Sequence, residues 1–139
     1  MATFKSLAKK LDKINDRLPE QVNKLAQQTA RDILTIVTSP GVTRVDTSEA
    51  LSNWRIGLGA RDPSTRAPFF KGKAGSTAAA SRAEVRLVGR QKIKRKKPGE
   101  EIHITNNVDH IDIAFDGDVD KIVAIADIQL NDRIQRFKL

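Results

Sequence analysis

Apolar residues recur every three or four positions through the start of the chain, and this spacing constrains the fold more than any other feature. The stripe consists of Phe4, Leu7, Leu11, Ile14, Leu18, Val22 and Leu25. Side chains at this spacing lie on one face of an α-helix, which predicts an amphipathic helical region. Pro19 interrupts the stripe, and proline suits the first turn of a helix far better than its interior. We therefore expect a short helix over residues 3–17 and a longer one from Pro19 to about Thr38.

The most direct role for this helix pair is to cover the core of the domain. A coiled-coil partner and a membrane surface are the alternatives. The polar face mixes Lys, Asp, Glu and Gln, whereas helices that lie on membranes carry mainly basic residues on that face. This mixture argues against the membrane alternative.

The size and composition bound the remaining possibilities. A chain of 139 residues is expected to form one domain with one modest core. With 4% aromatic residues, that core must consist mostly of Ile, Leu, Val and Ala. The absence of Cys excludes disulfides, thiolate metal sites and Cys nucleophiles. No apolar run is long enough to span a membrane and no secretory signal begins the chain, so we expect a protein made and used without export.

The middle of the chain changes from helical to extended patterns. Ser39-Pro40-Gly41 ends the predicted helix, and residues 42–45 are expected to be extended. Asp46, Thr47 or Ser48 then supplies an N-cap for a brief helix through Ala50 and Leu51. After it, apolar and other residues alternate as in a half-buried strand. The apolar positions of that strand are Trp54, Ile56 and Leu58.

A long segment rich in Gly, Pro, Ser, Thr and charge follows, from Gly59 to Thr77. Loops of this length are uncommon in compact domains unless they are functional or disordered. We expect a mobile loop. The adjacent pair Phe69-Phe70 within it either packs into the core or is kept for a partner, and the sequence favours neither.

The rest of the chain completes an α+β pattern. An Ala-rich helix is expected over residues 78–97, ended by Pro98-Gly99, with Val85, Leu87, Val88 and Ile93 as its apolar side. EIHIT (residues 101–105) alternates as a strand, and Asn106-Asn107 is a turn signal. Residues 108–115 fit a short helix or an irregular strand, and residues 119–136 a last helix. The predicted fold is α+β: N-terminal helices, a small antiparallel β-sheet, an Ala-rich central helix and a C-terminal helix.

The net charge of +8 is unevenly distributed. Residues 1–65 carry +3, residues 66–97 carry +10, and residues 98–139 carry −5. A basic middle beside an acidic end suggests an anionic partner or self-association through opposite charges. The candidate interface residues are Phe69, Phe70, Lys71, Lys73, Arg90, Lys92, Lys94, Arg95, Lys96, Lys97, Asp109, Asp112, Asp116, Asp118 and Asp120.

The segment RQKIKRKK, Arg90 to Lys97, holds six of these basic residues in eight positions. It could hold phosphates with an affinity that falls steeply with salt, or it could be a solvated helix end that the helix dipole favours. No aromatic residues interleave with it, and no motif that reads DNA surrounds it.

The sequence contains no catalytic constellation. His103 and His110 lack a clear third metal ligand, and the acidic residues of the C-terminal part do not follow the spacing of a calcium loop. No phosphate loop, dinucleotide fingerprint or nucleophile elbow is present. We therefore expect no enzymatic activity, no cofactor and no metal.

Two blocks of sequence resemble a known family. The first block, VDTSEALSNWRIGLGA (residues 45–60), and the second block, KPGEEIHITNNVDHI (residues 97–111), look like segments of tail-completion and minor tail proteins of long-tailed bacteriophages. In that family, Gly is commoner where Ser48 stands, and an aromatic residue is usual at His110. The scaffold residues of the family motif that match are Val45, Asp46, Thr47, Asn53, Trp54, Asn106 and Asn107. The resemblance spans roughly residues 20–115, and beyond Ile111 the chain departs from the family pattern.

The resemblance implies a structural virion protein of the phage neck, made in the host cytoplasm. It implies a ring, six-fold in the family, whose partners are the tail tube or tail terminator protein and the head connector or adaptor protein. In such a ring a basic surface facing an acidic one would fix the contact between neighbours. Alternatively the basic helix lines the channel and touches genomic DNA. A small basic nucleic-acid-binding protein is the competing interpretation, and neither involves a membrane.

Overall fold

One long helix organises the molecule. The computed structural model describes residues 4–111 and 115, with side chains from residue 19 onward. Helix α1 spans Phe4–Val37 without interruption, with Pro19 inside it. The predicted break at Pro19 is therefore wrong. Proline removes one backbone hydrogen bond but does not force a helix to end, and the apolar stripe continues on both sides of it.

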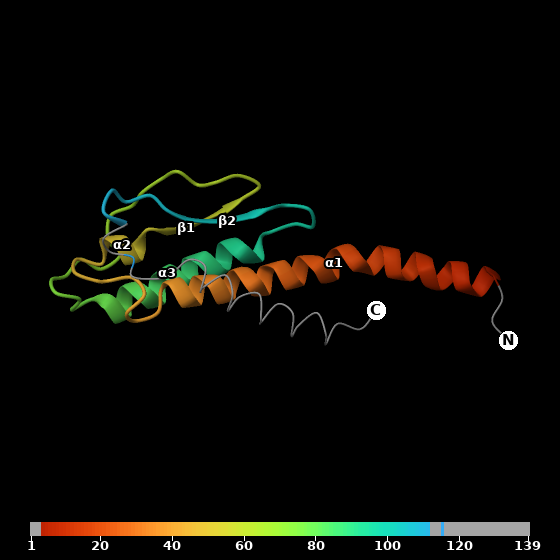
Figure 1. Ribbon diagram of the computed structural model, residues 1–139, viewed down its shortest axis with the longest axis horizontal. Helices are drawn as coiled ribbons and strands as arrows, with labels where there is room; N and C mark the ends of the chain where they lie inside the picture. Colours follow the sequence, from red (N-terminus) through yellow and green to blue (C-terminus); the bar gives the residue numbers. More distant parts are fainter. Residues whose placement is uncertain (1–3, 112–114, 116–139) are drawn as a thin grey trace.

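The other elements follow in the predicted order, and the fold is α+β. Helix α2 spans Glu49–Ser52 and strand β1 spans Trp54–Leu58. Helix α3 spans Ala78–Lys94 and strand β2 spans Ile102–Asn106. The two strands pair antiparallel, with Ile56 opposite Ile104. In Figure 1, α3 lies beside the C-terminal half of α1, and the strands and the long loop lie along one side of this helix pair, with β1 against α3 and β2 against α1.

The main core lies between the two long helices and the strand pair. It is formed by Ala30, Leu34, Ile56 and Ile93, with Ile102 and Ile104 of β2 packed against it. Helix α3 turns its buried face inward at four-residue spacing, through Ser81, Val85, Gly89 and Ile93. A Cβ added at Gly89 would lie 2.5 Å from a methyl of Leu34. The absence of a side chain there lets α3 approach α1 closely.

The predicted apolar side of α3 is wrong at one position. Leu87 is 50% exposed, because it stands two residues from Val85 and therefore on another side of the helix. The helix also ends before Pro98. Its C-cap is Arg95, and the tight turn that follows contains Gly99 with φ of +84°.

Arginine side chains of α3 cap the C-terminal end of α1. Arg82 Nε donates to the carbonyl of Thr38 at 2.6 Å, and Arg86 Nη2 donates to the carbonyl of Thr35 at 3.0 Å. The last turn of α1 contains no basic residue of its own. Carbonyls at this end of a helix lack intrahelical donors, and cations there interact favourably with the helix dipole. Burial lowers the pKa of Arg86 below its ordinary value, helped by the charges of Arg82 and Arg90, and the guanidinium still stays charged at neutral pH.

Amide side chains of α1 cap α3 in return. Gln27 Nε2 donates to the carbonyls of Ile93 at 3.2 Å and Lys96 at 3.4 Å. Asn23 Nδ2 donates to the carbonyl of Lys96 at 3.3 Å. The two helices are antiparallel, so each stands beside the C-terminal end of the other. Each helix thus supplies the donors that the other lacks.

The C-terminal side of the chain is described only in part. Thr43, in the segment predicted to be extended, forms an isolated antiparallel bridge with Phe115. Ala50 and Val108 form a small second core with Ile111 against them. The helix predicted for residues 119–136 lies outside the described residues.

Replacing Gln27 by Ala removes the donor group that caps α3. We expect the free energy of unfolding to fall by about 1–2 kcal/mol, because partly buried carbonyls lose their partner. Urea unfolding followed by circular dichroism measures this change. Gln28→Ala, which removes the same atoms one position along α1, is the control and should change stability by less than about 0.5 kcal/mol. Equal losses in the two variants would contradict the capping role.

Candidate interaction surface

The basic end of α3 is largely exposed. Arg90, Lys92, Lys94, Arg95 and Lys97 all present exposed side chains on or just after the helix. The buried face of α3 ends at Ile93, so these cations occupy its remaining sides. Five of the six basic residues in the segment from Arg90 to Lys97 are therefore placed where a partner could contact them.

Lys96 is the exception. Only 8% of it is exposed, and its Nζ donates to Asn23 Oδ1 at 2.5 Å and to the carbonyl of Lys97 at 3.1 Å. The prediction that Lys96 belongs to the outer basic surface is not borne out. Asn23 forms hydrogen bonds with both the carbonyl and the ammonium group of Lys96. This lysine therefore helps to hold the end of α3 against α1.

Asn53 holds the middle of the long loop. Its side chain is fully buried, and it meets both backbone groups of Arg66. The Arg66 N–H donates to Asn53 Oδ1 at 2.7 Å, and Asn53 Nδ2 donates to the Arg66 carbonyl at 2.9 Å and to the Glu49 carbonyl at 2.8 Å. One side chain thereby replaces a strand partner for a segment that has no regular secondary structure. The predicted mobility of residues 59–77 stays a prediction, but the structure anchors the segment at this point.

Asp62 fixes the first part of the same loop. Its carboxylate accepts from the hydroxyl of Ser64 at 2.6 Å and from its N–H at 2.9 Å, and it pairs with Arg55 at 3.2 Å. These hydrogen bonds from Ser64, and then the charge of Arg55, hold the pKa of Asp62 below its ordinary 3.8. The Asp62 carbonyl accepts from Thr105 and Asn107. The loop is thus bonded to both strands.

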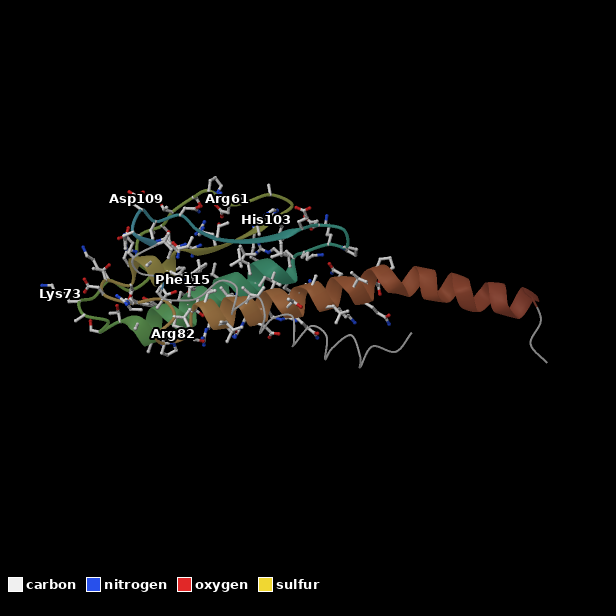
Figure 2. All side chains as sticks on the ribbon, in the orientation of Figure 1. Arg61, Lys73, Arg82, His103, Asp109 and Phe115 are labelled. Atoms are coloured by element: carbon white, nitrogen blue, oxygen red, sulfur yellow. The ribbon has the colours of Figure 1, made fainter. Side chains whose placement is uncertain are left out.

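The two phenylalanines of the loop have different environments. Phe69 is half-buried, its N–H donates to Ser52 Oγ at 3.1 Å, and the guanidinium of Arg66 lies 4.6 Å from its ring centre. Phe70 is 46% exposed. Lys71 and Lys73 are also exposed, and Figure 2 shows Lys73 at the end of the molecule, beyond α3. Of the two, Phe70 is therefore the one whose exposed ring is available to contact a partner.

Asp46, near the start of the first block, forms hydrogen bonds with the end of the long loop. Asp46 Oδ1 accepts from the N–H of Ala74 at 2.7 Å, and its carbonyl accepts from Gly75 at 3.0 Å. Ser48 occupies the N-cap position of α2, as one of the three predicted residues, but no side chain makes the expected capping bond. Instead Ser48 Oγ lies 2.8 Å from Thr77 Oγ1. Ser48 adopts φ of +69°, whereas residues that cap a helix in this way typically have an extended backbone.

Trp54 anchors the start of β1, as its position predicted. Its ring packs against the main core and lies edge-on to Phe115, with centroids 5.5 Å apart. Trp54 Nε1 donates to Thr43 Oγ1 at 3.1 Å, and the Thr43 hydroxyl donates to the carbonyl of Val37 at 2.6 Å. The indole therefore links the strand to the segment that follows α1. Val45 and Thr47 also match the family motif in this block, and both are half-buried.

The two asparagines of the second block are structural. Asn106 faces Trp54 in the strand register, and its Nδ2 donates to the carbonyl of Ala50 at 2.8 Å. Asn107 donates to the carbonyl of Asp62 at 2.9 Å and accepts from Arg61 Nη2 at 3.1 Å. The turn predicted at this pair lies further along the chain, because Asn106 is the last residue of β2 and the turn is formed at Asp109 and His110.

Only one residue of the acidic candidate surface can be placed. Asp109 is exposed, and Figure 2 shows it on the strand side of the molecule, near Arg61 and away from the helices. Asp112, Asp116, Asp118 and Asp120 lie outside the described residues. The basic end of α3 and Asp109 are separate surfaces.

The described residues contain no cluster suited to a metal. No group of three or more potential ligands among His, Cys, Asp and Glu occurs within residues 4–111 and 115. His103 Nε2 lies 3.1 Å from Glu101 Oε2 at an exposed position, and His110 is exposed. In the same part of the chain, no helix has the length and apolar character needed to cross a membrane.

Several side chains with structural roles escaped the sequence analysis. In the sequence, Arg82 and Arg86 contribute only to the basic charge of residues 66–97, Asp62 falls within the long loop, and Thr43 falls within the segment predicted to be extended. Their partners are up to about 50 positions away in the chain. Their position near a helix end or in a Gly-rich loop is the one local sign that such side chains bind backbone groups. It does not indicate which backbone group each side chain binds.

Comparison with models of known protein families, with curated proteins and with solved structures gave no match for this chain.

Replacing Asn53 by Leu leaves backbone groups of Arg66 and Glu49 without partners. We expect a loss of about 2–4 kcal/mol in the free energy of unfolding and faster tryptic cleavage between residues 59 and 77. Asn107→Ala is the comparison. Its partners are nearer to solvent, so water replaces the lost bonds and the loss should be smaller. Unchanged cleavage in the Asn53 variant would mean that other contacts hold the loop.

The lowered pKa of Asp62 makes its contribution depend on pH. A carboxyl whose pKa is lower in the folded state stabilises the fold above its unfolded pKa and loses that contribution as the pH falls through the folded pKa. Asp62→Asn should therefore cost stability at pH 7, and the difference from the wild type should shrink as the pH falls below 3.8. Urea unfolding at several pH values measures this. A difference that is constant with pH would rule out the ionised carboxylate as the cause.

Proposed function

We propose that the chain is a structural virion protein of the phage neck, a tail-completion or head–tail joining component. One observation carries the proposal. The two blocks of sequence that resemble the family lie far apart in the chain, yet they pair with each other in space. Trp54 of the first block faces Asn106 of the second, and Asn106 also binds the carbonyl of Ala50. The two blocks, whose matching residues we call the framework, are thus joined in the fold.

A second observation supports the resemblance at its main mismatch. Ser48 stands where Gly is commoner in the family, and it adopts φ of +69°. This left-handed conformation favours Gly on steric grounds. The Oγ contact with Thr77 at 2.8 Å helps to hold a serine there. The backbone at Ser48 therefore has a conformation that glycine adopts readily, in agreement with the glycine that is commoner there in the family.

The framework residues support a scaffold role and no catalytic one. Asp46, Asn53 and Asn107 each bind backbone groups of the long loop. They hold Phe70 and Lys73 at the surface in a defined position. We propose that this rigid base presents the loop to a neighbouring subunit, the tail tube or tail terminator protein, or the head connector.

The charge distribution offers a mechanism for self-assembly. A ring contact joins two different surfaces of the same chain. We propose that the exposed cations at the end of α3 meet the acidic segment from Asp109 to Asp120 of a neighbour, because opposite charges steer encounter and fix register. Lys96 is outside this surface, since it binds Asn23.

Electron microscopy of lysates tests the proposed function directly. The phage that carries this gene is grown with the gene disrupted, and particles are compared with those of the intact phage. Separate full heads and finished tails would support a role at the joint. Normal infectious particles would overturn the neck proposal.

Charge reversal tests the assembly mechanism. The triple variant Lys94→Glu, Arg95→Glu, Lys97→Glu should weaken ring assembly at physiological salt, because like charges then face each other. Light scattering coupled to size-exclusion chromatography measures the assembled mass. Lys24→Glu, on an exposed position of α1, is the control. Adding Asp116→Lys and Asp118→Lys should restore assembly, and a triple variant that assembles like the wild type would contradict the mechanism.

The second candidate function is nucleic-acid binding by the free protein. It is favoured by the five exposed cations at the end of α3. Phosphate contacts release counterions, so the affinity for duplex DNA should then fall steeply with salt. Tight binding with a steep slope, lost in the same triple variant, would favour this candidate. In the neck, the same cations would instead contact genomic DNA in the channel.

A further inference from the structure

The N-terminal half of α1 projects from the rest of the molecule. In Figure 1 this half, which we call the arm (residues 4–18), extends past every other described element. The body of α1 begins at Pro19, and the contacts with α3 that fix its direction involve Asn23, Gln27 and the C-terminal end.

The sequence of the arm is that of a helix that packs against something. Its apolar residues recur at three- and four-residue spacing, which gives the helix one apolar face. Its remaining positions include five basic and two acidic residues, for a net charge of +3. An isolated helix of this length is marginal in water, so most of its stability must come from packing.

A groove suited to such a helix lies on the body. It has a volume of about 460 Å³ between α1 and β2. Its walls are apolar along most of their length, and Val22 at one end is 52% exposed. Charged groups lie at its other side: Glu100, Glu101 and Lys96, the last of which is bound to Asn23. The apolar wall residues are Val22, Ala26, Ala30, Ile33, Ile102 and Ile104.

The arm cannot fill its own groove. One wall of the groove runs from Val22 to Ile33 on α1, and the arm is the continuation of that same helix. An α-helix does not fold back on itself. An arm that occupies this groove must therefore belong to another copy of the chain.

We propose that the arm of a second copy of this chain packs into the groove, with its apolar face against the walls. The lengths agree, since the arm is about 21 Å long and the α1 wall about 17 Å at 1.5 Å per residue. The charges agree as well, because a basic arm enters a groove edged by two carboxylates, with Lys96 the one cation in its described lining. Each copy has one arm and one groove, so the contact can link identical chains.

The test uses the full chain and two substitutions on opposite sides of the contact. Leu11→Asp places a charge on the apolar face of the arm, and Val22→Asp places one on the exposed wall of the groove. Each should raise the concentration needed for self-association about tenfold or more, since a buried unpaired charge removes a large part of the contact energy. Sedimentation velocity over a concentration series measures this.

Matched controls carry the same new group off the contact. Ser6→Asp lies away from the apolar face of the arm, and Lys24→Asp lies on an exposed position of α1. Both should associate like the wild type. Circular dichroism and thermal unfolding verify that every variant is folded.

A mixing experiment makes the test specific. The Leu11→Asp chain keeps an intact groove, and the Val22→Asp chain keeps an intact arm. Mixing the two should restore association that neither shows alone. A Val22→Asp chain that associates normally would overturn the proposal, because the arm would then bind another surface, another arm for example. So would a wild-type chain that stays monomeric through the series, or a mixture that does not associate.

This contact deepens the proposed assembly and rests on it for its biological setting. The two can fail separately. A closed dimer that is sensitive to both substitutions would keep the arm contact and argue against the ring. Detached heads and tails in the disrupted phage, together with indifference to both substitutions, would keep the neck role and remove the arm contact.

Discussion

The structure depends on two helices that complete each other's hydrogen bonding. Arg82 and Arg86 of α3 bind the last carbonyls of α1, and Gln27 and Asn23 of α1 bind the last carbonyls of α3. Such carbonyls have no intrahelical donor and are costly to bury alone. The exchange works only for an antiparallel pair in one register. It therefore fixes the relative position of the helices, and with it the platform on which the strands pack.

The second layer is held by side chains that take the place of a larger sheet. Two strands are too few to order a long connection, and the loop from Gly59 to Thr77 has no regular partner strand. Asn53, Asp62 and Asp46 each bind backbone groups within it. Gly57 permits the closest approach, since a Cβ there would lie 2.1 Å from the carbonyl oxygen of Ala60. The loop is thus laid over the strand pair by a small number of polar contacts.

Local patterns predicted the elements and not their mutual contacts. The alternation at Trp54, Ile56 and Leu58 and the strand at residues 101–105 needed only neighbouring residues, and both strands are present. The helix break at Pro19 failed because a local penalty of about 3 kcal/mol can be outweighed by a helical pattern that continues on both sides. Lys96 was counted as surface charge because burial depends on Asn23, 73 positions away. The groove between α1 and β2 could not be predicted for the same reason, since its walls come from segments that are distant in the sequence. The contacts of the acidic residues beyond Ile111 remain predictions.

Pro19 has a mechanical consequence for the long helix. It has no N–H, so the carbonyl four residues before it lacks its usual donor within the helix. The helix is held by one bond fewer at this point than elsewhere, and bending it there costs less than bending either half. A sideways force on the tip of α1 should therefore bend the helix near Pro19 before it bends the part that carries Asn23 and Gln27. The direction of the arm can thus change with less disturbance of the bonds between α1 and α3 than in a helix without proline.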